Sequence, residues 1–136
     1  RGYNIDSLTV CATDKPEQSR MTIVVKGDEH ILDQIQKQLS KLQEVIGIKK
    51  CEKLSSVQRE MGLIKVRAEA NNRGTIIETC DIYKARIVDV GLESVIIEIT
   101  GSEEKIESLL RLLEPYGILE YVRTGITSLD RGSAVM

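Results

Sequence analysis

Residues 94–118 read SVIIEITGSEEKIESLLRLLEPYGI, and within them a strand pattern changes to a helix pattern at a single glycine. The residues before that glycine are rich in β-branched side chains, which favour an extended strand. Gly101 breaks the strand, and Ser102 has the short oxygen-bearing side chain that caps a helix. The apolar residues that follow are spaced by three and four until Pro115 and Gly117 end the pattern. This stretch therefore predicts a strand followed by a helix with one buried face.

The same order of features occurs earlier in the chain. Residues 19–26 favour a strand, Gly27 breaks it, and Asp28 occupies the position of a helix cap. An amphipathic pattern then predicts a helix over 29–46, and residues 48–54 predict a further strand. The apolar positions of the two helices correspond as an internal repeat, which pairs Leu32, Ile35 and Leu39 with Ile106, Leu109 and Leu113.

The second half of the chain has the order β-α-β-β-α-β, which is the ferredoxin-like arrangement. Its expected elements are strands over 61–68, 86–90, 94–100 and 118–124, and helices over 75–83 and 103–114. The first half shows only β-β-α-β, and its opening strand, residues 3–11, alternates apolar and polar side chains imperfectly. Arg1 and Gly2 resemble the end of a helix. We therefore predict an α+β protein of two ferredoxin-like (βαββαβ) domains, 1–56 and 57–136, of which the first lacks its opening strand and helix.

The composition argues against several classes of partner. The chain has 19 basic and 21 acidic residues, whereas proteins that bind nucleic-acid phosphates carry a basic excess. It has no Phe or Trp, so its core is expected to be aliphatic and stacking on bases is hard to arrange. The charge clusters Lys49–Lys50 and Arg59–Glu60 are interpreted as solvated side chains, the second of them in a linker. No apolar run approaches the length that spans a bilayer. We expect neither nucleic acid nor a membrane as a partner.

Metal binding and catalysis have little support in the sequence. Cys11, Cys51 and Cys80 form no CxxC pair, and His30 is the single histidine, so no metal-ligand spacing is present. Unpaired cysteines are typical of the reducing cytoplasm. His30 lies on the predicted solvent side of its helix, and the sequence pairs no carboxylates. We expect no catalytic residues and no metal site, and the residues favour a binding or regulatory module.

Several segments together resemble one known family. They are RGYNIDSLTV at 1–10, SRMTI at 19–23, REM at 59–61, LIKV at 63–66, IVDV at 87–90, RTG at 123–125 and SLDRG at 128–132. These segments cover essentially the whole chain in order, without a large insertion. On these residues the chain resembles the small regulatory subunit of acetolactate synthase, also called acetohydroxyacid synthase.

The resemblance implies two modules and a catalytic partner. The first domain is similar to an ACT domain, a ferredoxin-like module that dimerises through its sheet edge and binds amino acids at the joint. The second is similar to the family's own C-terminal domain. Such subunits raise the activity of a separate catalytic subunit and confer feedback inhibition in branched-chain amino acid biosynthesis, typically by valine. Thiamine diphosphate, magnesium and FAD would belong to that partner, so the resemblance implies no cofactor for this chain.

The resemblance also points to effector-binding residues, Asn4 and Ile5. The Asn4 amide can donate to a carboxylate and accept from an ammonium, and the Ile5 backbone is expected at the sheet edge. The glycine-containing loop that holds the effector from the other side in the family has no counterpart in this sequence. Two alternatives are an ACT-type amino-acid sensor for another enzyme and a ferredoxin-like metal-sensing regulator.

Overall fold

The computed structural model describes residues 4–136, which form an α+β fold. Arg1 and Gly2, interpreted above as a helix end, lie outside the described residues. Within the described part of the chain, no helix is long and apolar enough to cross a membrane. The elements in chain order are β1 (Asn4–Ala12), β2 (Ser19–Lys26), α1 (Glu29–Ser40), β3 (Ser56–Arg67), α2 (Arg73–Ile82), β4 (Arg86–Val90), β5 (Ser94–Gly101), α3 (Glu103–Leu113), a 3-10 turn η1 (Glu114–Tyr116), β6 (Ile118–Arg123) and β7 (Thr127–Asp130).

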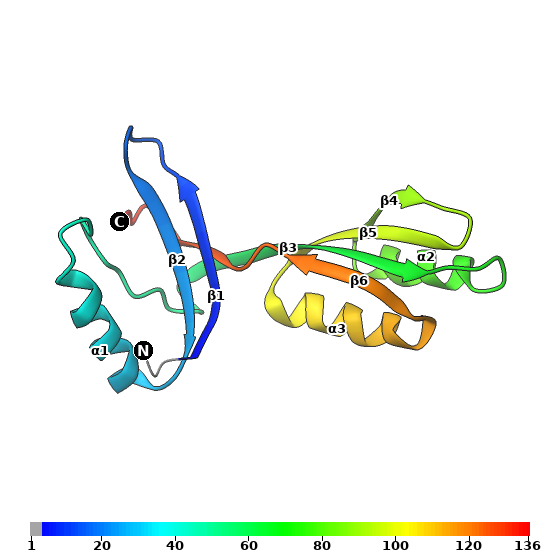
Figure 1. The fold of residues 1–136 in the computed structure, drawn as a ribbon, viewed down its shortest axis with the longest axis horizontal. Coiled ribbons are helices and arrows are strands. Elements are labelled where there is room, and N and C mark those ends of the chain that lie inside the picture. Colours follow the sequence, from blue (N-terminus) through cyan, green and yellow to red (C-terminus); the bar gives the residue numbers. More distant parts are fainter. Residues whose placement is uncertain (1–3) are drawn as a thin grey trace. The chain divides into compact units, whose positions relative to one another are not determined.

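The chain divides into two units, here called unit 1 (Arg1–Gln58 with Ile126–Met136) and unit 2 (Arg59–Gly125). Unit 2 has the predicted β-α-β-β-α-β order. Its antiparallel sheet has the strand order β4-β5-β3-β6, and α2 and α3 cover one face of it (Figure 1). The core between sheet and helices is aliphatic, as the composition predicts, and its fully buried side chains include Ile64, Val66, Ile76, Val95, Ile97, Ile99, Ile106 and Leu109.

The helix α3 shows why the opening stretch of sequence forms this structure. The hydroxyl of Ser102 accepts a hydrogen bond from the backbone N–H of Lys105 at 3.2 Å, which satisfies one free donor of the first turn. The apolar side chains at the three-and-four spacing are buried against the sheet. Gly117 ends the helical stretch of α3 and η1 at φ +102°, a conformation that favours glycine. The predicted cap, buried face and stop of this helix are thus confirmed.

Unit 1 contains the β1–β2 hairpin and α1. The strands pair antiparallel, with Ile5 opposite Val25 and Leu8 opposite Ile23. The register shifts between Ile5 and Ser7, which is a β-bulge. Val25 and Ile23 lie on the same face of β2 because they are two residues apart, so the bulge puts Ile5 on the same face as Leu8. The bulge therefore explains the imperfect alternation of this strand in the sequence.

The strand–helix junction of unit 2 recurs in unit 1, as the internal repeat predicts. Gly27 follows β2 and Gly101 ends β5, and a capping residue comes next in both places. Asp28 Oδ1 accepts a hydrogen bond from the backbone N–H of Ile31 at 3.1 Å, as Ser102 does at the start of α3. A Cβ at Gly27 would lie 2.9 Å from Cγ2 of Ile31, and a Cβ at Gly101 would lie 2.5 Å from Cδ of Lys105. Neither junction has free space for a Cβ.

α1 is shorter than the sequence predicts. It ends at Ser40, whose hydroxyl donates to the carbonyl oxygen of Lys37 at 2.9 Å, instead of continuing to Ile46. Leu42 and Ile46, which would extend its apolar face, are 51% and 81% exposed. A helix is stabilised mainly by packing of its apolar face, and these two side chains remain largely uncovered.

The prediction of a strand over 48–54 is wrong. A strand needs a hydrogen-bonded neighbour, and no strand of the described chain pairs with this segment. Its lysines form ion pairs instead. Lys50 Nζ lies 2.6 Å from Glu29 Oε2 on α1, and Lys49 pairs with Asp130 on β7. Side chains, and not a β-ladder, therefore connect this segment to the rest of unit 1.

The C-terminal tail contributes the strand β7 to unit 1. β7 pairs with β3, whose first residues, Ser56–Gln58, belong to unit 1. The backbone N–H of Arg131 donates to the carbonyl oxygen of Ser55 at 2.9 Å. Ile126 and Ser128 are buried. These contacts group the tail with unit 1, so the observed division differs from the predicted one into 1–56 and 57–136. A four-residue strand is too short to show a pattern in the sequence.

Candidate functional site

The predicted effector residues lie at the start of β1, on an open edge of unit 1. Asn4 is the first residue of β1 and lies opposite Lys26, and Ile5 lies opposite Val25. Among the described strands β1 pairs only with β2, so the backbone groups on its other edge have no strand partner. Such an edge can pair with another strand through its main chain. The structure thus places both predicted residues, which are neighbours in the sequence, at the start of β1 on this open edge.

One face of the hairpin is apolar and exposed. Directly opposite residues share a face, so this face carries the pairs Ile5–Val25, Leu8–Ile23 and Val10–Met21. Ile5 is 61% exposed, and Leu8, Val10 and Met21 are each more than half exposed. Neighbouring exposed apolar side chains are typical of an interaction surface. An isolated two-stranded hairpin is also marginally stable, so contact with another surface would stabilise this face.

The opposite face of the hairpin contacts the tail of the chain. Arg20 Nη2 donates to the backbone oxygen of Ser128 on β7 at 2.7 Å. The hydroxyls of Ser7 and Ser128 are buried, and neither has a hydrogen-bond partner among the described residues. Buried polar atoms without a partner are uncommon in folded proteins. The face of the hairpin that carries Ser7 and Arg20 is therefore the one that contacts the tail.

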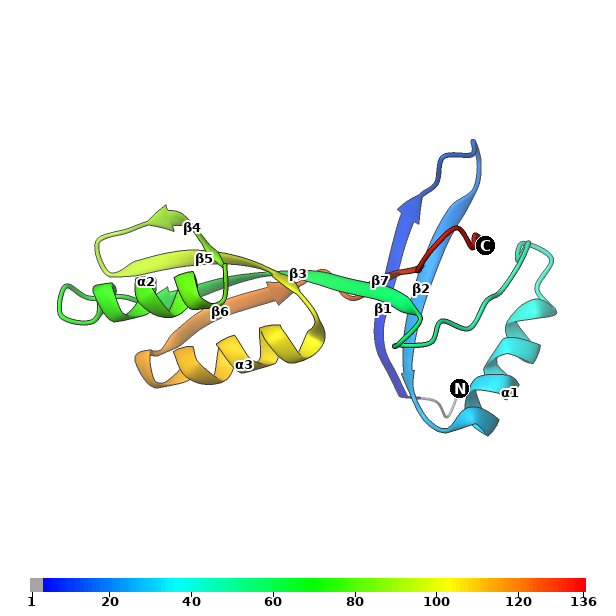
Figure 2. The same ribbon diagram turned by 180° about the vertical axis from the view of Figure 1, so that it is seen from behind.

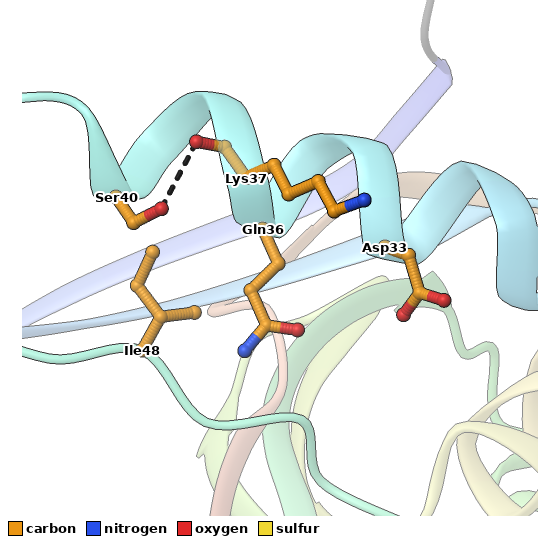
Figure 3. Close-up of a pocket in the computed structure, with 5 residues that line it drawn as sticks. All are labelled: Asp33, Gln36, Lys37, Ser40 and Ile48. Atoms are coloured by element: carbon orange, nitrogen blue, oxygen red, sulfur yellow. Dashed lines mark hydrogen bonds between the residues drawn. The ribbon is translucent and has the colours of Figure 1, made fainter.

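A cavity of about 360 Å³ lies beside α1 (Figure 3). It is lined by Asp33, Gln36, Lys37, Ser40 and Ile48, of which only Ile48 is apolar. Small-molecule sites are mostly apolar with a few placed polar groups, so this polar hollow is a poor match to an amino-acid pocket. The cavity contains none of the predicted effector residues.

The groups that could support metal binding or catalysis are scattered in the described part of the chain, where no three His, Cys, Asp or Glu side chains are placed to hold a metal ion. Cys11 is exposed and Cys80 is buried. Burial raises the pKa of the Cys80 thiol to about 11, and the negative charge of Asp81 adds to the effect. His30 is exposed on α1, and its ring lies 3.2 Å from the Gln34 amide.

The interpretation of Glu60 as a solvated linker charge is wrong. Glu60 lies in β3 and is only 6% exposed. The guanidinium of Arg123 on β6 donates to both of its carboxylate oxygens, at 3.1 Å from Nε to Oε1 and 2.7 Å from Nη2 to Oε2. Arg123 Nη1 also donates to Glu107 Oε1 on α3 at 2.8 Å. The hydrogen bonds to Glu60 are the main cause that raises the pKa of Arg123.

A signal for this cluster was present in the sequence. Glu60 precedes Gly62, Ile64 and Val66 at intervals of two, so it belongs to the buried face of its strand. A carboxylate on a buried face requires a cationic partner. The partner could not be identified from spacing, because Arg123 is 63 residues away in the chain.

The comparisons with known proteins assign both halves of the chain to one family. Residues 59–132 match the family described as the small subunit of acetolactate synthase. Residues 1–47 match the AHAS small subunit-like ACT domain. The first match covers unit 2 together with β7 of unit 1, and the second covers the hairpin and α1 of unit 1.

Relatives and a solved structure agree with these matches. The acetolactate synthase small subunit of Mycolicibacterium smegmatis is 54% identical over 132 residues, which cover 97% of this chain and 78% of the relative. The probable acetolactate synthase small subunit of Archaeoglobus fulgidus is 48% identical over 133 residues, covering 98% and 83%. The crystal structure of the acetolactate synthase small subunit from Thermotoga maritima is similar with a TM-score of 0.89 at 39% identity, covering 98% of this chain and 83% of that one. The chain therefore belongs to the family of acetolactate synthase small subunits.

Proposed function

We propose that this chain is a cytoplasmic regulatory subunit that acts on a separate catalytic subunit of acetolactate synthase. The match of residues 59–132 to the small-subunit family is the observation that carries the proposal. The chain binds the catalytic subunit, raises its activity and makes it sensitive to a branched-chain amino acid, with valine as the first candidate. The reaction itself, decarboxylation of pyruvate and condensation with a second 2-keto acid, belongs to the partner, which would carry thiamine diphosphate, magnesium and FAD.

The effector site of this proposal lies at the edge of β1, where two copies of the chain pair. Support comes from the backbone groups of β1 that pair with no other described strand, and from the exposed apolar face of the hairpin. A second copy along this edge would satisfy those backbone groups. The Asn4 amide then binds the carboxylate and ammonium of the amino acid, and the backbone of Ile5 completes the site.

Inhibition follows from a shift between two arrangements of the paired subunits. An effector changes an equilibrium only if it binds one arrangement more tightly than the other. A coupling of about 1–3 kcal/mol, which is usual for allosteric proteins, corresponds to a change of roughly 5- to 150-fold in affinity. The amino acid bound at the β1 edge would therefore alter how the subunit engages its catalytic partner.

Reconstitution with the acetolactate synthase catalytic subunit tests this proposal. Acetolactate formation is measured with and without the chain, and with valine, leucine or isoleucine added. Asn4→Ala should raise the half-inhibitory effector concentration about 10- to 100-fold, because a hydrogen bond to a charged group contributes roughly 1.5–3 kcal/mol. Activation should remain. Asn71→Ala, an exposed asparagine in unit 2, is the matched control and should change neither quantity.

Three outcomes would contradict parts of the proposal. Equal loss of activation and inhibition in Asn4→Ala would contradict a separate effector site. Failure of the wild-type chain to bind or activate the catalytic subunit would overturn the regulatory role. Capture of a different enzyme by the chain, with that enzyme responding to an amino acid, would favour an ACT-type sensor for another pathway.

A further inference from the structure

The ion-pair cluster of Glu60, Arg123 and Glu107 lies in unit 2 at the place where the chain enters and leaves this unit. The chain enters unit 2 at Arg59 and leaves it after Gly125. Glu60 is thus the second residue of the unit, and Arg123 is the third from its end. The chain therefore passes between the units through two connecting segments, Gln58–Arg59 and Gly125–Ile126. Both lie within three residues of this buried ion pair.

The cluster ties three elements of unit 2 together. Arg123 lies opposite Gly62 in the register of β6 and β3, and its guanidinium binds both carboxylate oxygens of Glu60. The Nη1 group of the same guanidinium donates to Glu107 Oε1 on α3. β3 and β6 run side by side with α3 against them in both views (Figures 1 and 2). One guanidinium therefore holds the two connecting strands to each other and to a helix.

Backbone contacts next to the ion pair complete this arrangement. The N–H of Thr124 donates to the carbonyl oxygen of Met61, and the N–H of Met61 donates to the Thr124 hydroxyl, both at 3.0 Å. The paired strands are thus joined up to one residue before Gly125, which has φ +88°. Beyond this point the chain passes to unit 1.

A buried ion pair is weak evidence for stability as such, because an apolar pair of similar volume often serves equally well. What a two-armed arginine–carboxylate contact adds is geometry, since its parallel hydrogen bonds form in one relative placement only. The Glu60 side chain is 4% exposed and that of Arg123 is 20% exposed, so water competes little for these bonds. The register of the two connecting strands is therefore fixed at this point.

Resting on the regulatory function proposed above, we propose that Glu60 and Arg123 are positioning residues that couple unit 1 to unit 2. The effector-dependent change in unit 1 reaches unit 2 through the two connecting segments, and the ion pair keeps these segments in one register so that they move together. Without it, unit 2 still folds and still activates the catalytic subunit, but it no longer follows the state of unit 1.

The test compares Arg123→Lys and Glu60→Gln in the reconstituted enzyme. Arg123→Lys keeps the positive charge and loses the two-armed contact, and Glu60→Gln keeps the shape and loses the negative charge. Both should raise the half-inhibitory valine concentration about 3- to 30-fold, the range found for residues that carry coupling, while activation stays within twofold. Arg111→Lys, an exposed arginine on α3, is the matched control and should behave as wild type. Glu107 is the more exposed of the two carboxylates that bind Arg123, so Glu107→Gln should raise the half-inhibitory concentration less than Glu60→Gln does.

Hydrogen–deuterium exchange of the free chain separates coupling from loss of folding. The variants should exchange faster at the amides of Met61 and Thr124, with the core amides of unit 2 unchanged. A wild-type complex that responds to valine, leucine or isoleucine and an Arg123→Lys complex that responds identically would overturn the coupling alone. A wild-type complex that responds to none of them would overturn the regulatory function and the coupling with it. Equal loss of activation and inhibition, with core amides exposed, would show a purely structural role and also overturn the coupling.

Discussion

Substitution of the two junction glycines tests whether the repeated strand–helix turns are equally tight. A Cβ at Gly27 would lie 2.9–3.0 Å from three atoms of Ile31. Ile31 is β-branched and sits in a helix, where one χ1 rotamer dominates, so it cannot turn away from the new methyl group. A Cβ at Gly101 would lie 2.5 Å from Cδ of Lys105. Lysine is unbranched and can move this atom by rotating about its own bonds.

The magnitudes follow from two opposing effects. Forcing an extra methyl group into a packed site costs about 1–3 kcal/mol. Replacing glycine with alanine where φ is negative stabilises by roughly 0.4–1 kcal/mol, because the unfolded chain has fewer conformations. Neither Gly27 nor Gly101 has a positive φ. Gly27→Ala should therefore destabilise unit 1 by about 1–2 kcal/mol. Gly101→Ala disturbs only the exposed Lys105–Thr100 hydrogen bond, so the net change should stay within about 0.5 kcal/mol.

Hydrogen exchange measured under increasing denaturant reports the stability of each unit in the same sample. Ile31→Ala removes two of the three crowding atoms, so the double variant Gly27→Ala/Ile31→Ala should be less destabilised than the sum of the single variants by about 1 kcal/mol. Equal destabilisation by Gly27→Ala and Gly101→Ala would refute the steric argument. Additivity in the double variant would refute it as well.

Two further predictions compare a buried side chain with an exposed one of the same type. Leu109→Ala should lower the free energy of unfolding of unit 2 by about 2–5 kcal/mol, whereas Leu112→Ala, at a half-exposed position on the same helix, should cost less than about 1 kcal/mol. Denaturant titration measures both, and similar losses would contradict the packing of α3. The Cys80 thiol has its pKa raised to about 11, so its reactive thiolate is scarce at pH 8 and increases only as the pH approaches 11. Mass spectrometry after iodoacetamide treatment at pH 8 should find exposed Cys11 modified and Cys80 intact, and equal rates in the folded protein would contradict the burial of Cys80.

The elements of unit 2 could be predicted because each carries its own signal. Ser102 caps α3, the apolar side chains follow at helical spacing, and Gly117 ends the helical stretch of α3 and η1. Periodicity shows which side chains can share a buried face, and in unit 2 the sheet covers that face. Leu109, for example, is fully buried where the pattern places it.

Unit 1 was less predictable because its elements depend on what lies beside them. Ile46 continues the helical spacing of α1, but it is 81% exposed and the helix ends before it. Residues 48–54 have a strand pattern, but no strand within residues 4–136 pairs with them. β7 shows the converse, because a short polar tail becomes a strand where β3 supplies the partner.

The candidate site divides in the same way. The segment at Asn4 and Ile5 could be identified through its resemblance to a family, and its place on an open strand edge agrees with that hypothesis. Effector binding by these residues stays a prediction. The Glu60–Arg123 contact was out of reach because it joins residues 63 positions apart, and only the fold brings them together.

Unit 1 consists of two stretches of chain, and unit 2 lies between them in sequence. Unit 2 could therefore be exchanged between relatives as one continuous segment, Arg59–Gly125, and the order of the two segments of unit 1 would not change. Unit 1, in contrast, is not one continuous segment. A stop codon after Gly125 would leave unit 2 whole and delete β7 from unit 1. Expression of unit 1 alone would accordingly require a short bridge from Gln58 to Ile126, whereas unit 2 could be expressed as an uninterrupted segment.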